Sequence, residues 1–309
     1  MTMTKEKPTL ESTLKSADTE EFIDIHFYRP IGYRWALFFN NLGVTPNQIT
    51  IAAIFIGVAA GICYYFDNIW INILGMFLLV WANSYDSADG QLARMTGQKS
   101  ELGRILDGAC GDFWFGAIYL AIVFRLQPTW GWWILLLALI TGYCHAKQAA
   151  MADYYRNVHL LFLKGKSGSE LHNSKELKER YKTLSWKKEP LVKFFETFYL
   201  SYTKGQERWT PCLQKMLCIL SEKYSGQTPE WFRTEFRTQS LPLMKYTNML
   251  SFNTRVIALF VSLLINMPWL YFAFEITVLN IMLVYMVARH ESICKYFIKK
   301  LESNSHTIY

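Results

Sequence analysis

The chain has 309 residues, of which 51% are hydrophobic, 16% aromatic and only 18% charged. Its apolar residues come in long blocks, and residues 35–66, 68–85, 126–144 and 256–274 contain no Asp, Glu, Lys or Arg. A helix needs about 20 mostly apolar residues to cross a bilayer, and only helices or closed barrels satisfy their backbone there. The blocks lack the short alternation of barrel strands. The composition therefore excludes an ordinary soluble domain and predicts an all-α, polytopic membrane protein.

The net charge of +7 would suggest nucleic acid as a partner in a soluble protein. Here the basic residues gather in loops beside apolar segments, which favours anionic lipid headgroups over nucleic acid. The six cysteines form no CxxC pair, so we expect packing roles for them and no disulfide framework.

The first 30 residues are expected to form a flexible tail, and residues 31–42 a short helix in the membrane interface. Thr45-Pro46-Asn47-Gln48 then predicts a helix start, with Thr as N-cap, Pro at the first position and Gln three residues after the cap. The first membrane helix runs from there to about Phe66. Its Gly57 and Gly61 are spaced for close approach of another helix.

Five further membrane helices are expected at about 68–86, at 103–124, from 129 into the polar run 145–156, at 251–265 and at 269–287, giving six in all. The implied parts are a tail (1–30), helices one to four (31–156), an insertion (157–245), helices five and six (246–290) and a C-terminal tail (291–309). The insertion holds short amphipathic segments, Leu191–Tyr202 and Cys212–Leu220, that are expected to form surface helices. We expect a cytoplasmic loop there, with a lid or docking module as the alternative.

Orientation follows from the basic residues. The short turns at 67–68, 125–130 and 266–268 contain a single one, Arg125, whereas segment 157–245 has 16 Lys and Arg against 9 Glu. The excess of positive charge faces the cytoplasm in membrane proteins. Both termini, the 90–103 turn and the insertion are therefore expected on the cytoplasmic side.

An acidic cluster stands at the cytoplasmic end of the second and third expected helices. Asp86 and Asp89 share a helix face because they are three residues apart, and Asp107 and Asp112 open the next helix. Ionised carboxylates at a membrane boundary are costly, so such a cluster calls for cations. Oxygen ligands favour Mg²⁺ or Mn²⁺, which act as Lewis acids in phosphoryl chemistry. Small residues, Gly90, Ala93 and Gly103, leave room beside the cluster for a nucleotide.

This window resembles the signature of the CDP-alcohol phosphotransferase (CDP-alcohol phosphatidyltransferase) family, Asp-x2-Asp-Gly-x2-Ala-Arg-x8-Gly-x3-Asp-x3-Asp. Seven fixed positions match at the family's spacing: Asp86, Asp89, Gly90, Ala93, Arg94, Gly103 and Asp107. The resemblance implies six helices, a polar cavity open to the cytoplasm and a metal held by the three aspartates. It also implies that Gly90, Ala93, Arg94 and Gly103 shape the pocket for the CDP group.

The last carboxylate of the signature, the family's proposed base, is missing. Its position holds Gly111, and the nearest carboxylate is Asp112. On an ideal helix residue 111 shares the face of Asp107, while Asp112 points elsewhere. A π-bulge across Gly108–Gly111 would turn Asp112 inward, and we take Asp112 as the catalytic candidate on that basis. The alternatives are another base or impaired catalysis.

Two basic residues near helix ends, Lys147 and Arg255, resemble positions where the family binds phosphorylated acceptors. The plain alternative is that they reach toward lipid headgroups. Glu275, inside the last expected helix, is expected near a turn or the lipid interface.

The expected function is metal-dependent transfer of a phosphatidyl-type group from a CDP-diacylglycerol-like lipid to a small polyol or polyol phosphate, such as inositol phosphate, with release of CMP. One alternative is transfer from a CDP-aminoalcohol to a lipid alcohol, diacylglycerol or ceramide-like. Another is a divalent-cation transporter, since intramembrane aspartates also mark ion paths. The expected location is a bacterial inner membrane, with the site facing the cytoplasm. Because family members often dimerise, the Gly57 and Gly61 pair serves either a homodimer or packing within one chain.

Overall fold

The computed structural model describes residue 10 and residues 16–98, 101–165, 168–169, 171–224 and 228–303, without the side chains of 101, 102, 104 and 191. Every regular element in this part is helical, which confirms the all-α prediction. The longer helices are α1 (Arg29–Asn41), α2 (Pro46–Cys63), α3 (Ile69–Thr96), α4 (Glu101–Trp130), α5 (Trp133–Lys164), α7 (Pro190–Trp209), α8 (Pro211–Tyr224), α11 (Phe252–Leu264) and α13 (Asn280–Ser303). The shorter ones are η2 (Asp24–Tyr28), α6 (Ser174–Thr183), α9 (Glu230–Ser240), η4 (Leu241–Leu243), α10 (Met244–Met249), α12 (Trp269–Phe274) and η5 (Glu275–Leu279).

The chain divides into two compact units. Unit 1 comprises residues 1–144 and 255–276, and unit 2 comprises residues 145–254 and 277–309. The chain passes from one to the other within α5, in α11 and within η5. The insertion expected at 157–245 belongs entirely to unit 2.

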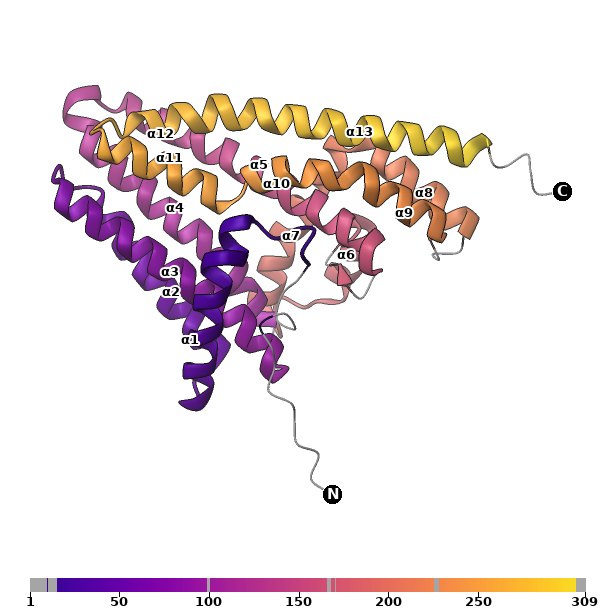
Figure 1. Ribbon diagram of the computed structural model, residues 1–309, viewed down its shortest axis with the longest axis horizontal. Coiled ribbons are helices and arrows are strands. Elements are labelled where there is room, and N and C mark those ends of the chain that lie inside the picture. The colour runs from indigo at the N-terminus through magenta and orange to yellow at the C-terminus, as the bar shows by residue number, and fades with distance from the viewer. Residues whose placement is uncertain are drawn as a thin grey trace, which may run out of the picture. The chain divides into compact units, whose positions relative to one another are not determined.

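In unit 1, α2 packs against both α3 and α4 (Figure 1). It begins at Pro46 as expected, and the Gln48 side-chain oxygen accepts a hydrogen bond from the Thr45 backbone N–H at 2.9 Å. A Cβ on Gly57 would lie 2.1 Å from the Trp114 ring of α4, so only glycine fits there. The Trp114 indole in turn donates to the Ala53 carbonyl at 3.0 Å. The small residues of α2 therefore serve packing inside one chain.

Arg125 of α4 joins two turns at the end of unit 1 away from the aspartates. Its guanidinium donates to the Asp67 and Asn266 side chains, at 2.7 Å each, and to the Tyr64 carbonyl at 3.3 Å. The turns after α2 and α11 thus lie together beside the end of α4. The turn between α4 and α5 comes later than expected, because α4 continues through Pro128 to Trp130 and Gly131 takes a φ of 63°.

The segment before α2 is more structured than expected. Residues 20–30, assigned to the N-terminal tail, include η2 and the start of α1, and Glu20 pairs with Arg29 at 2.9 Å. Helix α1 packs on α3, where a Cβ on Gly32 would lie 2.8 Å from the Ser87 hydroxyl. This contact packs α1 against the part of α3 that carries Asp86 and Asp89.

Unit 2 is built around the second half of α13, which packs against α8 and α9 (Figure 1). Phe232 and Phe236 of α9 contact Phe297 of α13, with ring centroids 4.7 and 5.7 Å apart. The prediction of a C-terminal tail from residue 291 is wrong up to Ser303, because this stretch continues α13 and buries Phe297 and Leu301. The expected surface helices of the insertion are confirmed as α7 and α8.

Within the described residues, five helical segments are long and apolar enough to cross a membrane: Pro46–Cys63, Ile105–Trp130, Trp133–Lys164, Glu230–Leu264 and Trp269–Ser303. The protein is therefore polytopic. Helix α3, which contains the second expected span, is not among them, and the count of six stays a prediction. Helices α3 and α13 run well past the ends expected at 86 and 287, and α5 continues to Lys164, past the run 145–156 in which its end was expected. Polar residues beyond an apolar span can keep the helical backbone hydrogen bonds, so the helices need not end where the apolar run ends.

Candidate active site

The acidic residues of α3 and α4 meet in unit 1. Carboxylate oxygens of Asp86, Asp89 and Asp107 all lie within 4.8 Å of one another. Asp89 is buried, Asp86 is half-buried and Asp107 is exposed, so the cluster opens toward solvent on the α4 side. The two helices thus bring together the three aspartates that the sequence selected as metal ligands.

Two residues that sequence reasoning missed support this cluster. The Thr50 hydroxyl of α2 hydrogen-bonds the Asp89 carboxylate, and both side chains are buried. The buried Cys110 thiol of α4 hydrogen-bonds Asp86. Neither had a sequence signal, since Thr50 lies in an apolar span and Cys110 in a run of small residues. Hydrogen bonds of this kind orient the carboxylates that hold a metal.

Arg94 lies one turn after Gly90 on α3 and folds back over it. A Cβ on Gly90 would be 3.4 Å from the Arg94 guanidinium, an ordinary contact distance, so the guanidinium lies directly beside the glycine. Two buried nitrogens of Arg94, Nε and Nη2, have no hydrogen-bond partner among the described residues. Buried donors are nearly always paired in proteins, so this guanidinium is suited to receive an anion.

Arg29, at the start of α1, is a further residue that sequence reasoning missed. It donates to the Ser87 hydroxyl at 3.4 Å, and its backbone carbonyl accepts from the Gln91 amide at 3.1 Å. Both partners lie between or beside the acidic residues of α3. Arg29 therefore fixes the α1 end against the helix that carries Asp86 and Asp89.

The carboxylate oxygens, together with the two unpaired nitrogens of Arg94, fit a divalent cation with a phosphorylated ligand. Three carboxylates offer the hard oxygen ligands that Mg²⁺ and Mn²⁺ prefer. The Arg94 nitrogens add a positive group beside them for phosphate oxygens. The cluster could thus hold a divalent metal.

The sequence of this region matches a known family. Residues 43–159 match the model described as CDP-alcohol phosphatidyltransferase. This segment therefore carries a match to a CDP-alcohol phosphatidyltransferase domain over somewhat more than a third of the chain. The match begins just before α2 and ends within α5, so it contains the whole acidic cluster.

Curated proteins are similar to this chain over segments of about 100 residues. An archaetidylinositol phosphate synthase of Pyrococcus horikoshii is 34% identical over 103 residues, 33% of this chain and 52% of that protein. A phosphatidylinositol phosphate synthase of Corynebacterium glutamicum is 34% identical over 97 residues, 30% of this chain and 38% of that protein. A Mycobacterium tuberculosis protein provisionally named cardiolipin synthase is 30% identical over 100 residues, 32% of this chain and 46% of that protein. The chain thus spans about half or less of the length of the curated relatives it matches.

The departure of the matched segment from the family signature lies on α4. The helix is α-helical throughout, so the π-bulge expected across Gly108–Gly111 is absent and Asp112 is exposed outside the three-aspartate cluster. A Cβ added at Gly111 would meet nothing within 4 Å. The position where the family places its carboxylate therefore has room for a side chain. The role of Asp112 stays a prediction.

The two basic candidates lie outside the cluster. Lys147 belongs to unit 2, where its amino group would be 3.5 Å from a Cβ on Gly205 of α7. Arg255 belongs to unit 1, where it is buried and forms an ion pair with Glu275. The expectation that Glu275 lies at the lipid interface is wrong, because this carboxylate is fully buried and also accepts from the Tyr271 hydroxyl at 2.7 Å. The π-helical turn η5 begins at this residue.

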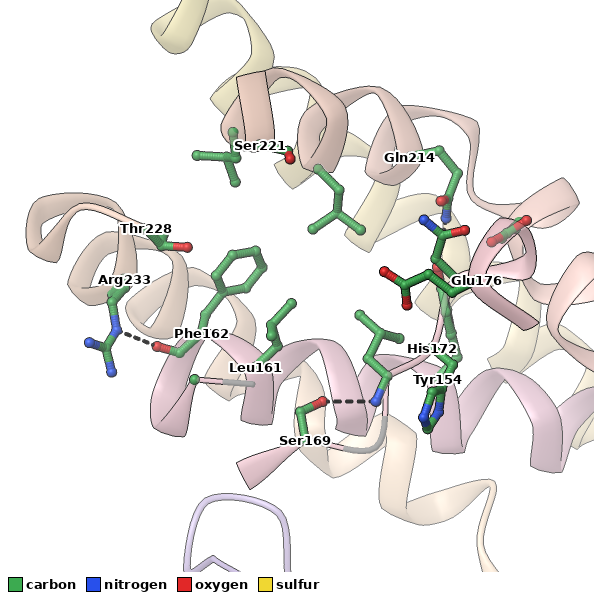
Figure 2. Close-up of a pocket in the computed structure, with 16 residues that line it drawn as sticks. Tyr154, Leu161, Phe162, Ser169, His172, Glu176, Gln214, Ser221, Thr228 and Arg233 are labelled. Carbon is green, nitrogen blue, oxygen red and sulfur yellow. Dashed lines mark hydrogen bonds between the residues drawn. The ribbon is translucent and has the colours of Figure 1, made fainter. Parts of the chain in front are cut away.

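Unit 2 contains a cavity of about 410 Å³ between α5, α6, α8 and α9, shown in Figure 2. Several polar groups around it bond to neighbouring protein atoms. Arg233 donates to the Phe162 carbonyl at 2.8 Å, and the Gln214 amide to the Tyr154 hydroxyl at 2.6 Å. Because these contacts join α5 to α8 and α9, the lining largely serves to hold the insertion together.

Proposed function

We propose that the protein transfers a phosphatidyl-type group from a CDP-linked lipid, such as CDP-diacylglycerol, to a small polyol phosphate, such as inositol phosphate, and releases CMP. The observation that carries this proposal is the cluster of Asp86, Asp89 and Asp107, with carboxylate oxygens within 4.8 Å of one another, inside the matched segment. The adjacent Arg94 guanidinium, with two unpaired buried nitrogens, supports a phosphorylated ligand at the same place.

In this reaction the acceptor oxygen forms a bond to the β-phosphorus of the CDP-lipid. The bond from that phosphorus to the bridging oxygen breaks, and CMP leaves with that oxygen. Asp86, Asp89 and Asp107 would hold the divalent ion, Mg²⁺ or Mn²⁺, which as a Lewis acid offsets negative charge on the diphosphate. Arg94 donates hydrogen bonds to phosphate oxygens, which orients the diphosphate against the cluster.

The space beside the cluster is proposed to receive the nucleotide. Gly90, Ala93 and Gly103 carry little or no side chain, so a cytidine phosphate can approach the backbone of α3 and α4. We further propose that Asp112 takes the proton of the acceptor hydroxyl. It lies outside the cluster here, but catalytic groups often align only when substrate is bound.

The acceptor is proposed from the relatives, two of which are named as inositol phosphate lipid synthases. Lys147 and Arg255 are proposed to bind the acceptor's phosphate. Arg255 would then exchange its bond to Glu275 for one to the phosphate. We also propose that the site faces the cytoplasm of a bacterial inner membrane, and that the protein acts there as a homodimer.

The deciding experiment measures CMP release by purified protein with CDP-diacylglycerol and a panel of acceptors: inositol phosphate, inositol, glycerol phosphate and serine. Each reaction is run with Mg²⁺ and with EDTA, and with Asp89→Asn as the matched inactive control. CMP release that needs both metal and inositol phosphate supports the proposal. Activity only with a CDP-aminoalcohol and diacylglycerol would contradict the proposed CDP-lipid donor. Metal uptake into proteoliposomes without CMP release would contradict the proposal that the protein is an enzyme.

A further inference from the structure

Helix α7 of the insertion exposes aromatic side chains on one side and buries polar side chains on the other, the opposite of an ordinary surface helix. Four aromatic residues face outward, and they are exposed by 48%, 60%, 37% and 40%: Phe194, Phe198, Tyr202 and Trp209. Their spacing of four, four and seven residues places them on one side of an α-helix. We call these four residues the aromatic face. Soluble helices place such residues inward, so this side is suited to a partner that is not water.

The opposite side of α7 is polar and buried. Glu196, Thr203 and Gln206 point inward. The Gln206 amide donates to the Ala150 carbonyl of α5 at 2.8 Å, and Glu196 lies 3.8 Å from Arg180 of α6. These contacts lie within unit 2, and they fix the helix so that its aromatic face turns away from α5 and α6. This orientation of α7 is therefore held by a specific hydrogen bond and an ion pair.

The contact with α5 sets the level of α7 relative to the bilayer. Helix α5 belongs to the candidate spans, and the sequence from residue 126 onward has no Asp, Glu, Lys or Arg until Lys147. The hydrocarbon region should therefore end near Lys147, where charge first becomes tolerable. Gly205 and Gln206 of α7 lie against Lys147 and Ala150. The C-terminal part of α7 thus lies where α5 leaves the membrane.

Exposed basic residues accompany the aromatic face. They stand just before α7 and in its last turns: Lys187, Lys188, Lys204 and Arg208. Trp186, next to the first pair, is exposed as well. Aromatic rings beside Lys and Arg are typical of helices that lie in the headgroup region of anionic membranes. The charge of this surface complements such a membrane.

We propose that the aromatic face of α7 docks in the headgroup region of the bilayer that the protein spans, at anionic phospholipids. The insertion is then held on the membrane surface by a second contact besides the spans. This inference concerns α7, which lies entirely outside the segment matched to the family. It does not depend on the proposed reaction.

The test uses the full chain in nanodiscs, with a photoreactive p-benzoylphenylalanine in place of Phe198. The same residue in place of Phe55, an exposed position of span α2, is the positive control for lipid contact. In place of Lys178, exposed on α6, it is the control for a surface in water. After illumination, mass spectrometry identifies the crosslinked product at each position.

Lipid adducts at position 198 that exceed those at 178 about tenfold, in discs with anionic lipid, support the proposal. Changing the four basic residues to Gln should lower the yield at 198 and leave the yield at 55 unchanged. A crosslinked dimer, or a crosslink from 198 to another segment of the chain, overturns it. Absence of lipid adducts at 198 while position 55 reacts also overturns it.

Discussion

Thr50 on α2 donates its hydroxyl to the carboxylate of Asp89 on α3, and both side chains are buried where the two helices meet. Asp89, the most buried of the three metal-ligand candidates, is thus oriented by α2, a helix that carries none of the acidic residues. Its position depends on the packing of α2 against α3.

Thr50→Val keeps the shape of the side chain and removes this hydrogen bond. We expect the affinity for Mg²⁺ and the rate of CMP release to fall about 10- to 100-fold, as for other residues that support metal ligands. Thr141→Val is the matched control, since Thr141 is buried in α5 and bonds its own helix at the Leu137 carbonyl, 2.8 Å away. Equal, small effects of both substitutions would contradict a role for Thr50 in the site.

Asp112→Asn tests the proposed base. We expect turnover to fall about 10²-fold or more, because a general base contributes about that much, while Mg²⁺ binding is retained. Unchanged turnover would exclude Asp112.

A second substitution, Gly111→Asp, places a carboxylate on the face of Asp107, where the structure leaves open space. We expect it to restore CMP release to the Asp112→Asn variant. Failure to do so in a folded, metal-binding double variant would show that position 111 cannot supply the base here.

Arg94→Lys keeps the charge and removes the planar group that fits phosphate with two hydrogen bonds. We expect the KM for the CDP-lipid to rise about tenfold, since one charge-assisted hydrogen bond is worth about 1.5–3 kcal/mol. Steady-state kinetics at fixed acceptor concentration measures this. If the KM for the acceptor rises instead, Arg94 contacts the other substrate.

Arg255→Met leaves Glu275 buried without its cation. We expect a loss of about 3–5 kcal/mol in stability, measured as unfolding in detergent, because one buried charge is no longer compensated. Lys182→Met, which breaks the exposed pair with Glu179, should cost less than about 1 kcal/mol.

The double variant Arg255→Met/Glu275→Met removes both charges and should recover most of that stability. If Arg255 also binds the acceptor's phosphate, the KM for inositol phosphate stays raised in this variant, by about tenfold or more. A normal KM would show that Arg255 only holds α11 to η5.

Gly57→Ala should disrupt the contact of α2 with α4, because the new methyl group would overlap the Trp114 ring. We expect a loss of about 1–3 kcal/mol, typical of overpacking. Gly116→Ala on α4 is the control, since a Cβ there meets nothing within 4 Å. Equal stability of the two variants would contradict the tight contact.

Much of the site could be predicted from local spacing. Asp86 and Asp89 share a helix face whatever the rest of the chain does, and eight residues between Arg94 and Gly103 suffice for a return. The start of α2 at Pro46 was also predictable, because capping depends on adjacent residues. Helix ends were less so, since α5 and α13 continue into polar sequence that composition alone cannot distinguish from a loop.

The sequence by itself determined the class of membrane protein, the acidic cluster and the family signature that the cluster resembles, because apolar length and residue spacing are local properties. Only the tertiary structure decided which distant side chains meet: Thr50 with Asp89, and Arg255 with Glu275. It also decided which side of α7 is buried. Helical periodicity indicates that two faces differ, but the partners that satisfy a buried charge or hydroxyl are set by packing between helices far apart in the chain.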